Sequence, residues 1–225
     1  MQLTILPTIL LLTAAIPNVL AVPTDQAVLT PSKDSDFSKI KHALQKAEII
    51  GDVLPDFTPK CYVLPSYSHG KKTKAVALGN KFKKSKTKKK PSLTVYCPNM
   101  KTTTGLTIAL TDPDAPSRKN PKWGEMCHWI APVSEAVSVA GEGEGVEFEV
   151  MGDSVDDLKK YKAPGPPEGT GYHRYVFVLL EGDNTNLTVP SDRQHWGTGK
   201  KGHGVRDWAE GQGLEVIGAN YFIEK

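Results

Sequence analysis

The stretch from Thr107 to Ala131 constrains the fold more than any other part of the chain. The apolar, β-branched run from Leu106 to Leu110 predicts a buried strand. It ends at the segment DPDAP, residues 112–116, where two prolines fix φ and remove two backbone donors. The carboxylates of Asp112 and Asp114 therefore stand on a stiff turn that follows a core strand. Loops on a rigid β scaffold often carry binding residues, so this turn is a candidate site.

Two later segments extend that candidate site. A second apolar patch, residues 127–130, carries His128, and a Pro/Gly-rich loop leads into a predicted strand that begins near His173. Taken alone, Asp-Pro-Asp is typical of a turn, and a histidine among apolar residues is typical of a hydrogen-bonded core residue. Two proline-stiffened loops, each followed by a histidine, instead favour one assembled pocket.

The motifs TDPDAPSRKNPKW with CHW, and GPPEGTGYHRYVFVLL, resemble those of the phosphatidylethanolamine-binding protein (PEBP) family, which includes Raf kinase inhibitor protein and the yeast carboxypeptidase Y inhibitor. Weaker matches, AEIIGDVLPDFTP and GLEVIGANYF, extend the resemblance over about residues 36–222. It implies a mainly β fold, a PEBP-like antiparallel β-sandwich with a few peripheral helices. The many short predicted strands and frequent Pro/Gly punctuation of the chain indicate a β-sandwich as well.

The resemblance also implies a pocket for phosphate, a phosphorylated head group or a small carboxylate. The ligand-binding residues that it implies are Asp112, Trp123, His128, Tyr161, Gly165, Pro166, Pro167, His173 and Tyr175, with Trp123 and Tyr161 at the rim. Imidazole N–H groups present hydrogen bonds to an anion, and a nearby carboxylate keeps one ring oriented and protonated. Asp112, His128 and His173 are also the candidates for moving a proton. No metal or cofactor is expected.

Three functions are compatible with such a pocket. The first is a secreted protein that binds a small anionic molecule or lipid head group without turnover. The second is a fungal secondary-metabolite protein that assists dimerisation or cyclisation of maleic-anhydride polyketides (maleidride type), alone or with a biosynthetic enzyme. The third is inhibition of a serine carboxypeptidase, which would make a protease the partner. Whether the protein is an enzyme is left open at this point.

The first residues predict the route of the protein through the cell. Residues 1–21 are apolar and end in Val-x-Ala, which predicts a cleaved secretory signal peptide. Residues 22–35 are polar and aperiodic, which favours a flexible leader, and residues 36–225 are the right length for one domain. No later stretch is apolar enough for a transmembrane segment. We therefore expect the secretory pathway, either outside the cell or in a vacuolar or endomembrane lumen.

Cysteine and glycosylation signals are consistent with that route. The chain has three cysteines, of which Cys61 and Cys97 lie on predicted strands and Cys127 lies in the buried motif. In an oxidising compartment we expect a Cys61–Cys97 disulfide and a free Cys127. Asn186-Leu187-Thr188 is an acceptor sequence for N-glycosylation.

A lysine-rich block, residues 71–90, holds ten of the 28 Lys and Arg residues. The block contains one aromatic residue, Phe82, and the segment from Val76 to Gly79 predicts a strand inside it. A solvated hairpin loop is therefore favoured, and nucleic acid is not expected as a partner.

Arg174 is expected in a structural ion pair. The other predicted elements are a helix over 37–47 capped by Ser35 or Asp36, a short helix near 205–209, and strands over 61–64, 92–97, 133–140, 146–150, 175–180, 187–189 and 214–222.

Overall fold

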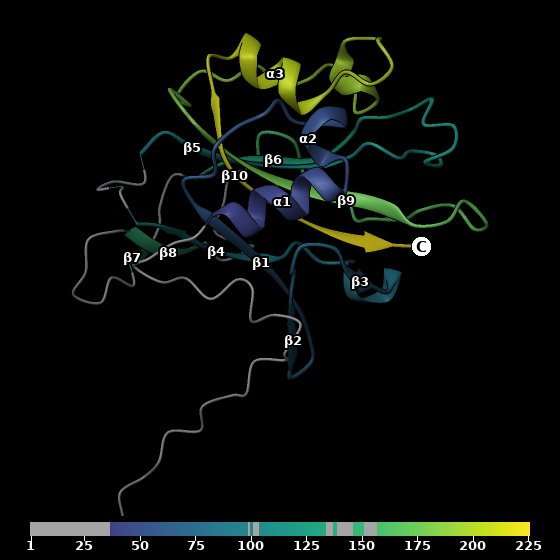
Figure 1. Ribbon diagram of the computed structural model, residues 1–225, viewed down its shortest axis with the longest axis horizontal. Helices are drawn as coiled ribbons and strands as arrows, with labels where there is room; N and C mark the ends of the chain where they lie inside the picture. Colours follow the sequence, from purple (N-terminus) through teal and green to yellow (C-terminus); the bar gives the residue numbers. More distant parts are fainter. Residues whose placement is uncertain (1–36, 99, 101–103, 134–136, 139–145, 151–156) are drawn as a thin grey trace, which may run out of the picture.

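Two five-stranded sheets pack face to face, with helices on the outer side of one of them (Figure 1). The computed structural model describes residues 37–98, 100, 104–133, 137–138, 146–150 and 157–225. The predicted signal peptide and leader, residues 1–21 and 22–35, lie outside the described residues. The mainly β, sandwich-like class predicted from the sequence is confirmed.

The first sheet has the strand order β2-β1-β4-β8-β7, and all its pairs are antiparallel. Its strands are β1 (Tyr62–His69), β2 (Lys72–Ala75), β4 (Ser92–Cys97), β7 (Val137–Ser138) and β8 (Val146–Val150). A disulfide joins Cys61 to Cys97, with an S–S distance of 2.00 Å, and Cys127 is free and buried. The bridge links the residue before β1 to the end of β4.

The second sheet has the order β3-β10-β9-β5-β6 and carries the motifs singled out in the sequence. Its strands are β3 (Asn80–Phe82), β5 (Leu106–Asp112), β6 (Met126–Val133), β9 (His173–Glu181) and β10 (Glu215–Glu224). All seven residues of β5 are buried, as are the first eight of β9. Both faces of this sheet are covered, which explains why these strands read as continuous apolar runs.

The two faces of β9 show how the core is divided. Tyr175, Phe177 and Leu179 pack between the sheets, whereas Val176 and Val178 pack on the opposite face. The helices that cover this second face are α1 (Ser38–Lys46), α2 (Ile49–Asp52) and α3 (Val205–Gly211), and Trp196 of the 3-10 turn η3 (His195–Gly197) packs there with them. A second 3-10 turn, η2 (Lys84–Lys86), follows β3. Figure 1 shows α2 and α3 above the β5, β6 and β9 layer. Among the described residues, no helix is long and apolar enough to span a membrane.

Most predicted elements are confirmed, but two predicted strands are wrong. Val76–Gly79 is a turn after β2, because side-chain oxygens of Asn80 and Asn220 accept the N–H groups of Ala77 and Leu78 (3.0 and 2.9 Å). Residues 187–189 form no strand either. Trp208 Nε1 donates to the Thr188 carbonyl (2.8 Å) and the Thr188 N–H donates to Gln212 Oε1 (2.7 Å), so contacts with the α3 region replace strand pairing. The predicted capping residues Ser35 and Asp36, and part of the predicted 133–140 strand, lie outside the described residues.

Candidate functional site

A cavity of about 240 Å³ lies where the end of β5, the start of β6 and the start of β9 meet the loop before β9. It contains all of the predicted ligand-binding residues except Tyr161. The lining residues are Asp112, Ala115, Pro116, Trp123, Met126, His128, Lys162, Ala163, Gly165, Pro166, Pro167, His173, Tyr175 and Gln194. The separate motifs of the sequence therefore form one site.

A β-bulge places His128 in this cavity. The β5–β6 register runs from Leu110 opposite Trp129 to Thr111 opposite Cys127, so His128 is the extra residue. In a regular strand Cys127 and Trp129 would share a face. Here Cys127 packs on the helix side and Trp129 packs between the sheets. His128 lines the cavity beside them, which is a common use of a bulge next to a functional site.

Asp112 is held by two hydrogen bonds that use different oxygens of its carboxylate. Oδ1 accepts the backbone N–H of Asp114 (2.8 Å), as expected for a carboxylate in an Asx-type turn. Oδ2 accepts a hydrogen bond from His173 Nδ1 (2.9 Å). The Asp112 and His173 side chains are 3% and 1% exposed, so this pair is shielded from solvent.

The contacts around His173 can accommodate a proton on each ring nitrogen. Nδ1 faces the Asp112 carboxylate, which only accepts, and Nε2 lies 3.1 Å from Thr170 Oγ1. The Thr170 hydroxyl donates its own proton to the Pro167 carbonyl (2.7 Å), so its oxygen accepts from Nε2. Burial lowers the pKa of His173, but the hydrogen bond and charge of Asp112 outweigh it and raise the pKa above its usual value. The raised pKa favours the imidazolium form of His173 beside the Asp112 carboxylate.

His128 is in the opposite state. Its Nδ1 donates to the Lys162 carbonyl (2.7 Å), which assigns the ring proton to Nδ1 and leaves Nε2 as an acceptor. Burial lowers the pKa of His128 below its usual value, more than the nearby Asp112 raises it. The cavity thus holds two histidines whose environments shift their pKa values in opposite directions, with the neutral form favoured for His128 and the charged form for His173.

Tyr175 packs against both imidazoles. Its ring centroid lies 5.3 Å from that of His128, edge-on, and 6.3 Å from that of His173, stacked. The Gly165 N–H donates to the Tyr175 hydroxyl at 3.4 Å. Burial, followed by the charge of Asp112, raises the pKa of this tyrosine well above its usual range. The hydroxyl therefore stays protonated and remains a neutral donor.

The outer wall of the cavity is formed by Trp123 and Met126. Trp123 is 37% exposed, and the Lys122 ammonium lies 5.2 Å from its ring centroid. Met126 gives the wall a flexible apolar side chain. The next residue, Gly124, has no room for a side chain, because a Cβ there would lie 2.2 Å from the Pro113 carbonyl oxygen. Only glycine allows this segment to approach the 112–116 turn so closely.

Tyr161 lies outside the cavity, which corrects the sequence prediction. Its hydroxyl donates to the Thr87 carbonyl (2.7 Å) and lies 3.2 Å from the Tyr67 hydroxyl. Its ring packs edge-on against Trp129, with the centroids 6.2 Å apart. The next residue, Lys162, lines the cavity. Successive side chains of an extended segment point to opposite sides, so Tyr161 points into the interior.

The second carboxylate of the turn has a structural contact instead of a place in the cavity. Asp114 accepts hydrogen bonds from Arg174 Nη2 (2.7 Å), Nε (3.0 Å) and the Arg174 backbone N–H (2.8 Å). Arg174 Nη1 also donates to the Ala47 carbonyl (2.8 Å) and to Asp52 (3.0 Å). The predicted structural ion pair of Arg174 is confirmed. It ties the turn, β9 and the first two helices together.

Sequence reasoning missed three polar residues that contact this site: Thr170, Lys162 and Gln194. Thr170 lies three residues before His173 in the sequence, and this short separation was the one local indication that the two side chains are in contact. Gln194 reaches the cavity from a distant loop and had no local signal. Among the residues that the structure describes, no three His, Cys, Asp or Glu side chains are placed to hold a metal ion. Asn186, the predicted glycosylation acceptor, is exposed on a turn.

Comparison with known proteins gives a consistent result. Residues 72–222 match the family described as phosphatidylethanolamine-binding protein. The chain is 31% identical to the carboxypeptidase Y inhibitor of Saccharomyces cerevisiae over 206 residues, which cover 79% of this chain and 91% of that protein.

Solved structures give the same match. The crystal structure of carboxypeptidase Y inhibitor complexed with the cognate proteinase has a TM-score of 0.72 and 29% identity, covering 84% of this chain and 95% of that one. A phosphatidylethanolamine-binding protein from Plasmodium vivax shares the fold, with a TM-score of 0.62, 20% identity, and 82% and 96% of the chains covered. With the motifs gathered around one cavity and this sequence match, the chain belongs to the phosphatidylethanolamine-binding protein family.

Proposed function

We propose that the cavity binds a small anionic group, namely a phosphate, a phosphorylated lipid head group or a carboxylate. The observation that carries this proposal is the buried contact of His173 Nδ1 with the Asp112 carboxylate (2.9 Å) in the wall of the cavity, which raises the pKa of His173. Asp112 keeps the ring charged and oriented, and its second oxygen is engaged by a backbone N–H. The carboxylate is therefore shielded by donors from a bound anion.

The Thr170 hydroxyl indicates where an anion oxygen would sit. Its oxygen lies 3.1 Å from His173 Nε2. An anion oxygen in its place would receive a charge-assisted hydrogen bond, which is stronger than the bond to a hydroxyl. The Tyr175 hydroxyl and the exposed Lys162 side chain add a neutral donor and a positive charge at the same cavity.

The test is sulfate binding measured by calorimetry as a function of pH, since sulfate does not change its charge over the range used. The pKa of His173 is raised above 6.5, so its charge is present below that raised pKa and lost as the pH rises through it. We expect sulfate affinity to follow the same course. His173→Gln should weaken binding by about 1.5–3 kcal/mol, or about tenfold to a hundredfold, at the acidic end. The exposed His42 is a matched control, and His42→Gln should change nothing.

Asp112→Asn separates a positioning role from simple attraction. Without the carboxylate the pKa of His173 falls, so the pH midpoint of sulfate binding should move down, while affinity at low pH is retained. Unfolding measured on each variant excludes loss through misfolding. A sulfate affinity that is unchanged in both variants, or that does not depend on pH, would contradict the assignment of this cavity.

The second candidate function is inhibition of a serine carboxypeptidase. It is favoured by the similarity to carboxypeptidase Y inhibitor, which extends over 91% of that protein, and by the fold shared with the inhibitor in its proteinase complex. We expect the purified protein to abolish carboxypeptidase Y hydrolysis of a peptide substrate at near-equimolar ratio and to leave a metallocarboxypeptidase active. Full carboxypeptidase Y activity in the presence of excess protein would remove this candidate.

Two other expectations from the sequence stay predictions. Passage through the secretory pathway is supported by the apolar segment at residues 1–21 and by the exposed acceptor Asn186. Assistance of maleidride-type dimerisation would require a dicarboxylate in the same cavity, so anion binding is a precondition for it.

A further inference from the structure

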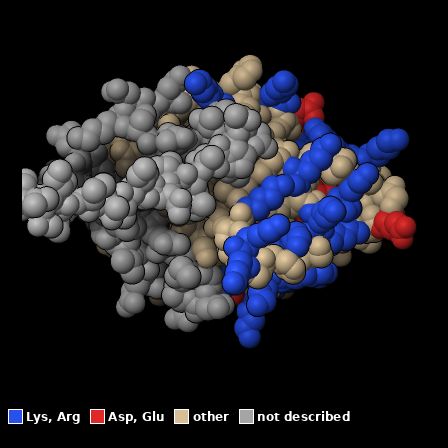
Figure 2. Space-filling view, turned by 90° about the horizontal axis from the view of Figure 1, so that it is seen from below, with Lys and Arg blue, Asp and Glu red and all other residues tan. Residues whose placement is uncertain are grey.

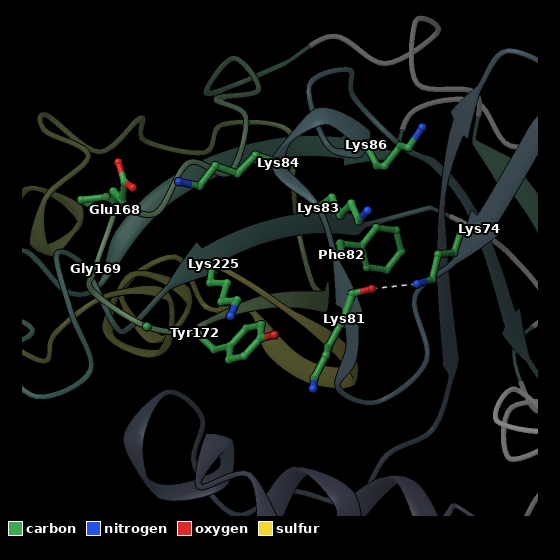
Figure 3. Close-up of a pocket in the computed structure, with 12 residues that line it drawn as sticks. Lys74, Lys81, Phe82, Lys83, Lys84, Lys86, Glu168, Gly169, Tyr172 and Lys225 are labelled. Atoms are coloured by element: carbon green, nitrogen blue, oxygen red, sulfur yellow. Dashed lines mark hydrogen bonds between the residues drawn. The ribbon is translucent and has the colours of Figure 1, made fainter.

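A second hollow, of about 1130 Å³, lies between β3, the η2 turn and the loop before β9 (Figure 3). We call it the lysine groove. Its cationic lining residues are Lys74, Lys81, Lys83, Lys84, Lys86 and Lys225. Five come from the lysine-rich block, and Lys225 lies just after β10, far from that block in the sequence. The groove is several times larger than the anion cavity.

The groove has few acidic groups of its own. Among its described lining residues, Glu168 alone has a carboxylate side chain, and the nearby Glu224, which interacts electrostatically with Lys84, is buried. Within the described part of the chain, none of the six lysines forms an ion pair. Figure 2 shows Lys and Arg side chains gathered on one face with few acidic groups among them. The groove is therefore a focused positive field that attracts an anionic partner.

Two aromatic rings lie beneath the lysines of the groove: Phe82, which is 5% exposed, and Tyr172, which is half-buried and gives the groove most of its aromatic surface. The Lys74 ammonium lies 4.7 Å from the ring centroid of Phe82, and Lys81 and Lys225 lie 5.2 and 5.1 Å from that of Tyr172. These cation–π contacts hold the charged ends near the rings. The long aliphatic stems of the lysines add further apolar surface. Such a lining is complementary to a ligand with both carboxylates and apolar side chains.

Protection of an edge strand explains only part of this arrangement. β3 is an edge strand, and lysines on an edge oppose aggregation. Lys74 Nζ also donates to the Lys81 carbonyl (2.7 Å), which blocks one backbone acceptor on that edge. Lys84 and Lys86 on η2, and Lys225 beyond the end of β10, lie outside β3 and yet line the same hollow. Edge protection does not require them there.

We propose that the lysine groove docks an acidic, partly apolar segment of a partner protein. Nucleic acid fits less well, because the described residues that line the groove include no arginine, the side chain that pairs with phosphates and bases through two parallel hydrogen bonds. A membrane fits less well, because a flat surface contacts projecting residues and would leave the hollow unfilled and its two aromatic rings without contact. The proposal does not depend on the anion cavity, although Pro167 lines both.

The test uses fluorescence anisotropy of a labelled peptide of repeated Glu-Glu-Phe units, with the whole protein at moderate salt. The test variant is Lys83→Glu/Lys86→Glu, whose two sites are exposed. The matched control is Lys200→Glu/Lys201→Glu, an equal change in charge at exposed sites outside the groove. We expect the test variant to bind the peptide about tenfold more weakly and the control to stay within about twofold.

Two comparison probes complete the design. A Glu-Glu-Ser peptide should bind more weakly than the Glu-Glu-Phe peptide, because it cannot pack against the aromatic rings. Three results would overturn the proposal: equal losses in the two variants, equal affinity for the two peptides, or stronger binding to an RNA oligonucleotide or to phosphatidylserine vesicles that the test variant abolishes. Sulfate binding to the anion cavity should be the same in the test variant, so the two proposals can fail separately.

Discussion

Replacing Asp114 by alanine is expected to lower the free energy of unfolding by about 3–5 kcal/mol, the usual cost of removing one partner of a buried ion pair. The Asp114 side chain is 1% exposed and that of Arg174 is 5% exposed. Alanine cannot accept the three hydrogen bonds that Arg174 donates to Asp114. The Arg174 guanidinium then keeps only its hydrogen bonds to Asp52 and to the Ala47 carbonyl. Urea denaturation followed by tryptophan fluorescence measures the loss.

Asp52 provides a matched control because it pairs with the same arginine. Its side chain is 51% exposed, so the same type of ion pair is screened by water. Asp52→Ala should cost only about 0–1 kcal/mol. If the two variants lose similar free energies of unfolding, burial does not determine the strength of these ion pairs, and the structural role of Asp114 is contradicted.

Removal of the Cys61–Cys97 disulfide is expected to have an effect of similar size. The bridge closes a loop of 36 residues, and the chain-entropy relation for that length gives about 4 kcal/mol at 25 °C. Both cysteines are buried next to strands of the first sheet, so the loss should appear as a lower unfolding midpoint of the whole domain. A Cys61→Ala/Cys97→Ala protein, compared by urea denaturation, measures it.

Cys127 is the control for that experiment. It is equally buried but free, and burial raises the pKa of its thiol to about 12, so the thiol is neutral and unreactive at physiological pH. Cys127→Ala removes one buried sulfur and should cost about 1 kcal/mol. If the double variant loses no more stability than Cys127→Ala, the disulfide makes no net contribution to folding.

The two carboxylates of the turn show how the tertiary structure divides similar residues between two roles. Asp112 and Asp114 are two residues apart with a proline between them, and nothing local distinguishes them. Asp112 pairs with His173 in the cavity, and Asp114 pairs with Arg174 at the helices. His173 and Arg174 are neighbours on β9, where successive side chains point to opposite faces. The alternation of β9 therefore selects which carboxylate serves the site and which serves the scaffold.

The sequence by itself determined the local features of this protein. Apolar runs bounded by prolines and glycines predicted the central strands, because a strand covered on both faces must be apolar throughout. The family motifs predicted most of the cavity, because their residues lie at the ends of those strands. The Cys61–Cys97 pair follows from two cysteines on predicted strands and a third in the buried motif.

Only the tertiary structure decided the features that depend on contacts between distant segments. His128 faces the cavity because β6 has a bulge opposite β5. In a regular strand its two neighbours, Cys127 and Trp129, would lie on the same face of the sheet. The pKa values of His128 and His173 shift in opposite directions because burial lowers that of His128, whereas Asp112, 61 residues away in the sequence, raises that of His173. The lysine groove exists because β3 pairs with β10 in parallel, which brings Lys81 beside Ile223. Periodicity and local motifs carry no information about such pairings, since the energy that selects them is gained only when the whole core packs.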